Sequence, residues 1–84
     1  SYPKALWWLK LSEEKEAILN SVLEQQKSAT HTYMDSGLSF YRHAQPEEAK
    51  MCWEVALKLA GGWWPEDAEQ IRNYLKELIL YENR

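Results

Sequence analysis

Apolar residues recur at helical intervals along most of the chain, and nowhere do they alternate with polar residues as they would in a half-buried strand. The first apolar face consists of Ile18, Leu19, Val22 and Leu23. Ser12 precedes this face as a candidate N-cap, and glutamates follow in the first turn, where the helix dipole favours negative charge. We therefore expect a helix over about residues 12–27, with this face directed inward.

The polar stretch from Ser28 to Thr32 has weak helix propensity, and we expect a short turn there. No Gly or Pro marks a break, so one long helix from Ser12 to about His43 is an alternative that the sequence leaves open. With the turn, a second helix covers about residues 32–43. Residues 1–11 are expected to form an irregular entry or a short helical strap over the bundle.

Proline and glycine delimit two further helices. Pro46 suits a first helical turn, and Gly61-Gly62 is a strong termination signal, which predicts a helix over about residues 46–60. Pro65 starts a last helix over about residues 65–82. The chain is thus predicted to be a single all-α domain over residues 1–84, a small four-helix domain.

Composition excludes several classes of partner. The 10 basic and 13 acidic residues are interspersed and give a net charge of −3, which argues against nucleic acid. The longest apolar run, Ala5 to Leu9, is far shorter than the roughly 20 residues of a membrane span. The single cysteine, Cys52, excludes an internal disulfide framework and favours a reducing, cytoplasmic compartment. Because the chain begins with Ser1, we expect a processed or excised segment.

Three small residues in the middle of the chain indicate closely packed helices. Gly37, Ala49 and Ala56 are spaced 12 and 7 residues apart, and large side chains surround them in the sequence. Small residues opposite large ones let two antiparallel helices approach closely across a short turn. We therefore expect a tight helical hairpin at the centre of the domain.

This hairpin resembles one tetratricopeptide repeat, a helix–turn–helix of about 34 residues. The resemblance spans roughly Thr30 to Trp63. It is carried by Tyr33, Gly37, Phe40, Tyr41, Glu48, Ala49, Trp53, Ala56, Leu57 and Leu59. The chain departs from the family pattern in the turn Ala44-Gln45-Pro46 and at Gly61-Gly62, where the family usually carries Pro. The resemblance implies a C-terminal capping helix and an N-terminal helix that, with Trp7-Trp8, covers the other end.

The helix over residues 32–43 carries a second apolar stripe, although a surface helix needs only one. This stripe consists of Met34, Leu38 and Tyr41, flanked by His31 and Arg42. The resemblance implies that it lines a concave groove for an extended or helical peptide, and an apolar, Met-containing groove favours an amphipathic helix or hydrophobic peptide. The alternative is that the first and last helices bury the stripe.

The five tryptophans offer further contact candidates. In the adjacent pairs Trp7-Trp8 and Trp63-Trp64, one ring of each pair is expected in the core and the other exposed, with Trp8 and Trp63 as candidate anchors for a partner. The alternative is that both pairs close the ends of the core. Trp53 lies within the hairpin pattern and is expected to be buried.

No catalytic, cofactor or metal site is predicted. The spacing of His31, His43 and Cys52 matches no zinc pattern, and no second cysteine is present. We therefore predict a non-enzymatic protein–protein interaction module that binds a hydrophobic or amphipathic peptide or helix. An engineered or structural bundle without a natural ligand is the second hypothesis, and a small-molecule binder or small enzyme with a Trp- and Tyr-lined cavity is the third. The sequence does not indicate the oligomeric state.

Overall fold

The computed structural model describes the backbone of residues 4–83 and the side chains of residues 9–83, and its regular structure is entirely helical. α1 spans Lys4–Arg42, α2 spans Pro46–Ala60 and α3 spans Pro65–Glu82. The segments between these helices are turns, and no strand occurs within the described range. The all-α class is therefore confirmed, with three helices in place of the four expected.

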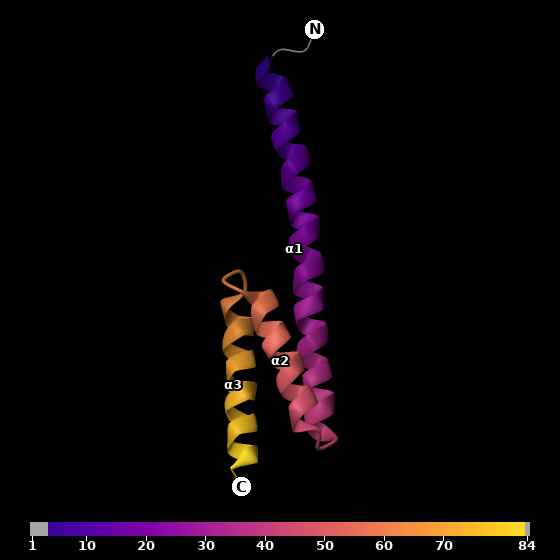
Figure 1. Cartoon of the computed structure of the whole chain (residues 1–84). Helices are drawn as coiled ribbons and strands as arrows, with labels where there is room; N and C mark the ends of the chain where they lie inside the picture. The colour runs from indigo at the N-terminus through magenta and orange to yellow at the C-terminus, as the bar shows by residue number, and fades with distance from the viewer. Residues whose placement is uncertain (1–3, 84) are drawn as a thin grey trace.

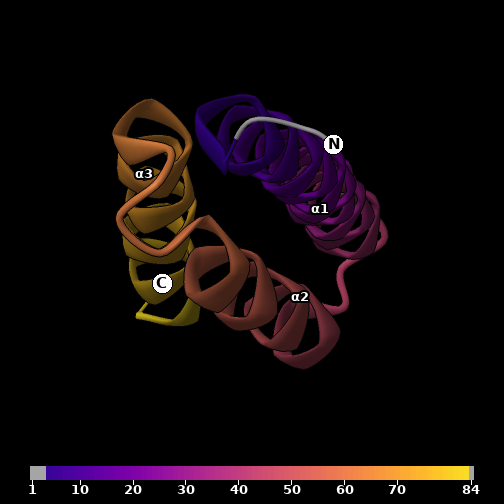
Figure 2. The same ribbon diagram turned by 90° about the horizontal axis from the view of Figure 1, so that it is seen from above.

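α2 packs against the C-terminal part of α1 and α3 packs chiefly against α2, so the molecule is strongly elongated (Figure 1). Its principal extents are 71 × 18 × 13 Å. The paired region ends near Gln26, whose side-chain amide donates to the carbonyl of Leu59 at 2.6 Å. Viewed from above, the three helices stand around a common centre (Figure 2). N-terminal to Gln26, α1 continues as a single helix beyond the α2–α3 turn.

The turn expected at Ser28 to Thr32 does not form, because this stretch continues the helix. The hydroxyl of Thr30 donates to the carbonyl of Gln26, and that of Thr32 donates to Ser28, at 2.9 and 3.0 Å. Both hydroxyls are thereby bonded within the helix, and the small helix-propensity cost of threonine is not enough to break α1. The open alternative of one long helix is therefore the correct one.

The N-terminal strap is also absent from the described residues, since α1 already begins at Lys4. Residues 4–11 form the first turns of α1 and lie at the end remote from α2 and α3 (Figure 1). They do not cross over the bundle. The expectation that this segment covers one end of the core is therefore wrong.

α2 and α3 span the residues expected from the sequence, and local chemistry explains their ends. Each begins at a proline, Pro46 or Pro65, followed by two acidic residues in the first turn. Proline fits there because a first-turn N–H has no intrahelical partner. α2 ends where Gly61 adopts φ +52°, and its N–H donates to the carbonyl of Leu57. That φ favours glycine.

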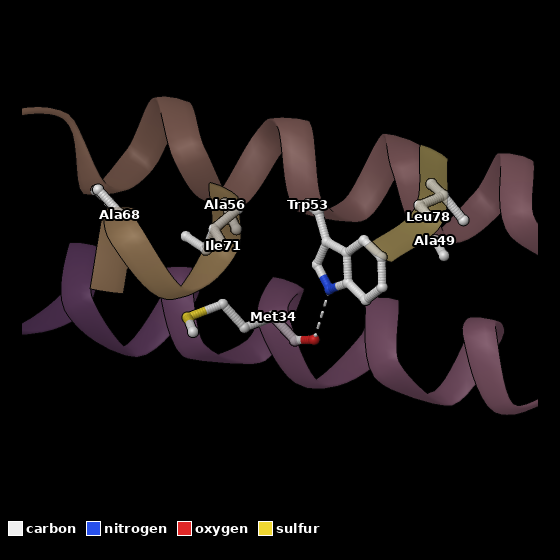
Figure 3. Close-up of a cluster of buried hydrophobic side chains, with 8 residues drawn as sticks. Met34, Ala49, Trp53, Ala56, Ala68, Ile71 and Leu78 are labelled. Atoms are coloured by element: carbon white, nitrogen blue, oxygen red, sulfur yellow. Dashed lines mark hydrogen bonds between the residues drawn. The ribbon is translucent and has the colours of Figure 1, made fainter. Parts of the chain in front are cut away.

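The core lies at the contact of all three helices, around Trp53. The buried residues are Met34, Ala49, Trp53, Ala56, Ala60, Ala68, Ile71 and Leu78. Gly37 of α1 lies directly against the indole of Trp53, which leaves no room there for a Cβ atom. The indole N–H donates to the carbonyl of Met34 at 3.2 Å (Figure 3). The tight helical hairpin and the buried Trp53 are therefore confirmed.

Candidate functional site

Met34, the centre of the expected groove, is not available to a partner in this structure. Its exposed fraction is 6%, and it belongs to the buried cluster that includes Ile71 of α3 (Figure 3). α3 reaches this stripe of α1 through side chains, and Ile71 lies with Met34 in the buried cluster. The expectation of an open groove at Met34 is thus wrong, because the last helix covers the stripe.

The neighbouring residues of the stripe are partly covered by the same helix. Leu38 and Tyr41 are half-buried against the core. The Tyr41 ring lies 5.9 Å from the Trp53 ring and 5.7 Å, edge to face, from that of Tyr81 in α3. These aromatic contacts stabilise the packing of α3. Only the outer edges of Leu38 and Tyr41 remain open.

The polar residues that flank the stripe are exposed. Nε2 of His31 lies 3.0 Å from a carboxylate oxygen of Asp67, which ties α1 to the start of α3. Arg42 is exposed at the end of α1, beyond the covered part of the stripe. His31 therefore contributes to the packing of the domain, whereas Arg42 is open to solvent.

The two tryptophan candidates have different outcomes. Trp63 lies on the α2–α3 turn with an exposed fraction of 60%, whereas its neighbour Trp64 is half-buried against the core. One ring of this pair is therefore exposed and the other is half-buried, as the sequence predicts. The side chains of Trp7 and Trp8 lie outside the described residues.

Exposed apolar residues also lie on α1 beyond the paired region. We call the segment from Leu9 to Leu23 the α1 extension. Its exposed apolar residues are Leu9, Ile18, Leu19 and Val22, with Leu11 and Leu23 half-buried. Ile18 alone has an exposed fraction of 66%. No helix of the described chain lies beside this surface (Figure 1), and only the α2–α3 turn approaches its end at Leu23.

The extension continues the face that is buried lower on the same helix. Positions 19, 23, 26, 30, 34, 37 and 41 follow one another at intervals of three or four residues and therefore share one side of α1. From Thr30 to Gly37 this side is buried, and at Leu19 it is exposed. The difference arises because α2 ends, and α3 begins, near the level of Gln26. Sequence periodicity revealed this stripe, but it gave no signal that α2 and α3 would leave it uncovered.

A hollow lies where the extension meets the α2–α3 turn. Its volume is about 270 Å³, and it is lined by Asn20, Leu23, Glu24, Lys27 and Trp64. An adjacent hollow of about 200 Å³ lies between Lys27 and the turn residues from Trp63 to Asp67. Both are open to solvent, so they are suited to accept a side chain from a helix laid along the extension.

A third hollow lies on the outer side of α2 and α3. Its volume is about 280 Å³, with Leu75, Leu78 and Ile79 as its apolar lining. Lys50, Glu54 and Glu82 form its rim. We call this surface the outer groove. It faces away from the α1 helix of its own chain.

Within residues 4–83, no three His, Cys, Asp or Glu side chains come together as ligands of a metal ion would. Burial raises the pKa of the Cys52 thiol, which favours the unreactive protonated form. Nδ1 of His43 bonds the carbonyl of Ser39 at 2.7 Å and is turned to its own helix. The same part of the chain includes no helix with the length and apolar character of a membrane span.

Comparison of the chain with protein-family models, curated proteins and solved structures found no match.

Proposed function

We propose that the chain is a protein–protein interaction module whose recognition surface is the α1 extension, and that it binds an amphipathic helix there. The observation that supports this proposal is the continuity of one apolar stripe from the buried core to the exposed extension. A helix that faced only water on all sides would not need such a stripe. Contiguous exposed apolar surface of this kind is typical of a site for protein association.

The shape of the ligand follows from the shape of the surface. The extension is one continuous helix. The side of α1 that α2 contacts C-terminal to Gln26 has no neighbouring helix N-terminal to Gln26. A partner helix laid there would pack as α2 packs, with apolar side chains recurring every three or four residues. The hollow beside Leu23 and Trp64 would receive one large side chain from that partner.

Charges at the edges of the stripe restrict the partner further. Glu14 and Glu16 border the stripe on its two sides, and Lys15 lies between them within it. A partner with Lys or Arg beside its apolar residues, and an acidic group opposite Lys15, complements this pattern. The long stem of Lys15 is itself apolar and packs without leaving its ammonium group buried.

We further propose that the fold is of the tetratricopeptide type, with α1 and α2 as its hairpin and α3 as a capping helix. The close contact of Gly37 with Trp53, and the complete burial of Ala49 and Ala56, support this interpretation. The contact surface that we favour differs from the concave groove of that family, since α3 covers Met34 here.

Selection of helices from a displayed peptide library tests the proposed function. The bait is the purified chain, compared with the double variant Ile18→Glu/Val22→Glu. Both positions are at least half exposed, so the variant is expected to fold with its stability changed by less than about 0.5 kcal/mol per site. Wild type should enrich amphipathic helices that the double variant does not bind.

A matched control excludes a general effect of added charge. Met51 on α2 has an exposed fraction of 68% and lies outside the extension and the residues lining the outer groove. Met51→Glu should therefore enrich the same helices as wild type. Helices that bind wild type and the double variant equally would refute the extension as the recognition surface.

A further inference from the structure

We propose that the helix bound by the α1 extension is the α1 extension of a second copy of this chain, and that the two extensions pair antiparallel. They meet along a seam, which consists of Leu11, Lys15, Ile18 and Val22. This inference rests on the proposed function and names its partner. Two extensions related by a two-fold axis present the same seam to each other, so the contact closes with two copies.

The spacing within the seam is that of a two-stranded coiled coil. Its members are 4, 3 and 4 residues apart, the alternation with which two helices pack knobs into holes. A stripe of this kind is narrower than the face that a helix presents to a globular core, and one facing helix covers it. Ile18 and Val22 have exposed fractions of 66% and 50%, so the single chain leaves both uncovered.

The free length of α1 determines how far two copies can overlap. When Lys4 of the second copy lies level with Val22, the extensions overlap over residues 4–22, which is about 27 Å at the α-helical rise. The second helix then ends about one turn before Gln26, near which the paired region of α1 ends. No described helix lies beside the extension, so none has to move (Figure 1).

The same overlap brings the seam positions level with one another. Leu11 lies level with Lys15 of the second copy, and Ile18 lies level with helix position 8, which is Trp8 in the sequence. Each of these layers occurs twice because of the two-fold axis. In the layer of Leu11, the apolar stem of Lys15 packs against leucine while its ammonium group reaches the edge of the seam.

Lys15 determines the direction of the pairing. Glu14 of the second copy lies about 4.5 Å from Lys15 along the common axis, within reach of the lysine side chain. The two Lys15 residues lie about 6 Å apart along this axis, so each is nearer in level to an opposite charge than to its like. The two Glu14 carboxylates share one flank of the seam, where the lysines neutralise them. Parallel pairing would set Lys15 directly opposite Lys15, and such like-charge contacts are strongly disfavoured.

A shift of the second copy by one heptad fits less well. It carries the first residues of that copy past Gln26, to the part of α1 that packs against α2. It also places the two Lys15 residues about 4.5 Å apart along the axis, and Lys15 about 6 Å from Glu14. The extension therefore matches its own antiparallel copy in length, apolar spacing and charge at one and the same overlap.

Sedimentation equilibrium over a micromolar to submillimolar concentration series tests the inference. A seam of fewer than three heptads is a small interface, so wild type should pass from the monomer mass to twice that mass within this range. Ile18→Glu/Val22→Glu should weaken association at least about tenfold. Circular dichroism of each variant establishes that it is folded.

Reversal of the central charges tests whether the partner is a second copy. Lys15→Glu brings like charges together across the axis and should weaken the dimer at least about tenfold, and Glu14→Lys should do the same. The double variant Glu14→Lys/Lys15→Glu restores opposite charges in both contacts, so it should regain most of the lost affinity. Glu13→Lys is the matched control: Glu13 lies on the side of α1 opposite the seam, and this variant should dimerise as wild type does.

A nitroxide label at position 21 measures the relative direction of the two helices. Ser21 is exposed and lies outside the seam, and the variant Ser21→Cys/Cys52→Ser carries a single thiol for labelling. Antiparallel pairing places the two labelled positions about 24 Å apart along the axis, whereas parallel pairing separates them only by the interaxial distance of about 8–10 Å. Pulsed electron paramagnetic resonance should give the longer distance.

Four results would overturn the inference. They are a wild-type chain that stays monomeric at every concentration, a dimer that Ile18→Glu/Val22→Glu does not weaken, a double charge variant as weak as its parents, and labels at the shorter distance. If a monomeric wild type still selects helices that depend on Ile18 and Val22, only the second copy is refuted as partner. If helix selection also fails, the proposed function falls with it.

Discussion

Replacement of Gly37 by alanine is the sharpest test of the packing at the centre of the domain. A Cβ atom at this position would lie 2.5 Å from Cδ1 and 2.8 Å from Cε2 of Trp53, and closer still to Nε1. Such contacts are not tolerated, so the ring or the helix must move. The ring is almost fully buried and its N–H is bonded to the Met34 carbonyl, which leaves it little freedom.

The expected cost follows from three opposing effects. Forcing a methyl group into a packed core costs about 1–3 kcal/mol. Loss of the indole hydrogen bond adds about 1–3 kcal/mol if the donor stays buried. Alanine recovers about 1 kcal/mol in helix propensity over glycine. We therefore expect Gly37→Ala to lower the free energy of unfolding by about 2–4 kcal/mol.

Thermal unfolding followed by circular dichroism measures this change. For a domain of this size, the loss corresponds to a fall in Tm of roughly 10–25 °C. Gly62→Ala is the matched control, because no atom lies within 4 Å of its added Cβ, and its stability should change by less than about 0.5 kcal/mol. A Gly37→Ala variant with a Tm within a few degrees of wild type would refute the close crossing of α1 and α2.

The remaining predictions concern one buried apolar residue and the single thiol. Met34→Glu should lower the free energy of unfolding by more than about 3 kcal/mol, because it places an unpaired charge in the core. Denaturant unfolding measures this change. A variant as stable as wild type would show that the stripe at Met34 is open. In the folded chain, Cys52 should react with a thiol reagent at pH 8 more slowly than it does in the urea-unfolded chain, because burial raises the pKa of its thiol and the thiolate is the reactive form. The rate in the folded chain should rise with pH. Equal rates in the folded and unfolded chain would contradict this prediction.

The parts of the fold that could be predicted from the sequence depend on local signals. Pro46, Pro65 and Gly61 each act within one helical turn, and the helices that they delimit have the expected bounds. The small residue Gly37 likewise required a large partner nearby, and Trp53 is that partner. Each of these features is decided by the chemistry of a few neighbouring residues.

The continuity of α1 could not be decided in the same way. Thr30 and Thr32 have weak helix propensity, yet this disadvantage is small and their hydroxyls bond back within the helix. Thr30 is also fully buried, so tertiary packing holds this part of α1 together. Low propensity over a few residues, without Gly or Pro, was therefore insufficient to predict a turn.

The candidate site was misplaced for a related reason. Periodicity showed which side of α1 is apolar, and it showed this equally for Met34 and for Leu19. Which of the two is covered depends on the path of α3 and on where α2 ends, and no residue of α1 encodes either. The stripe at Met34 is covered by α3, and the stripe at Leu19 is left exposed.

The unequal lengths of the helices link stability to association. α1 has 39 residues against 15 in α2 and 18 in α3, so its N-terminal half has no intramolecular partner. A single helix of about 20 residues is only marginally stable in water, and most helices depend on packing of their apolar face. The extension is held by continuity with the packed half of α1 alone, until a partner covers Ile18 and Val22. Binding on this surface would therefore stabilise the extension itself, and protection of its backbone amides from hydrogen exchange would rise with the fraction bound.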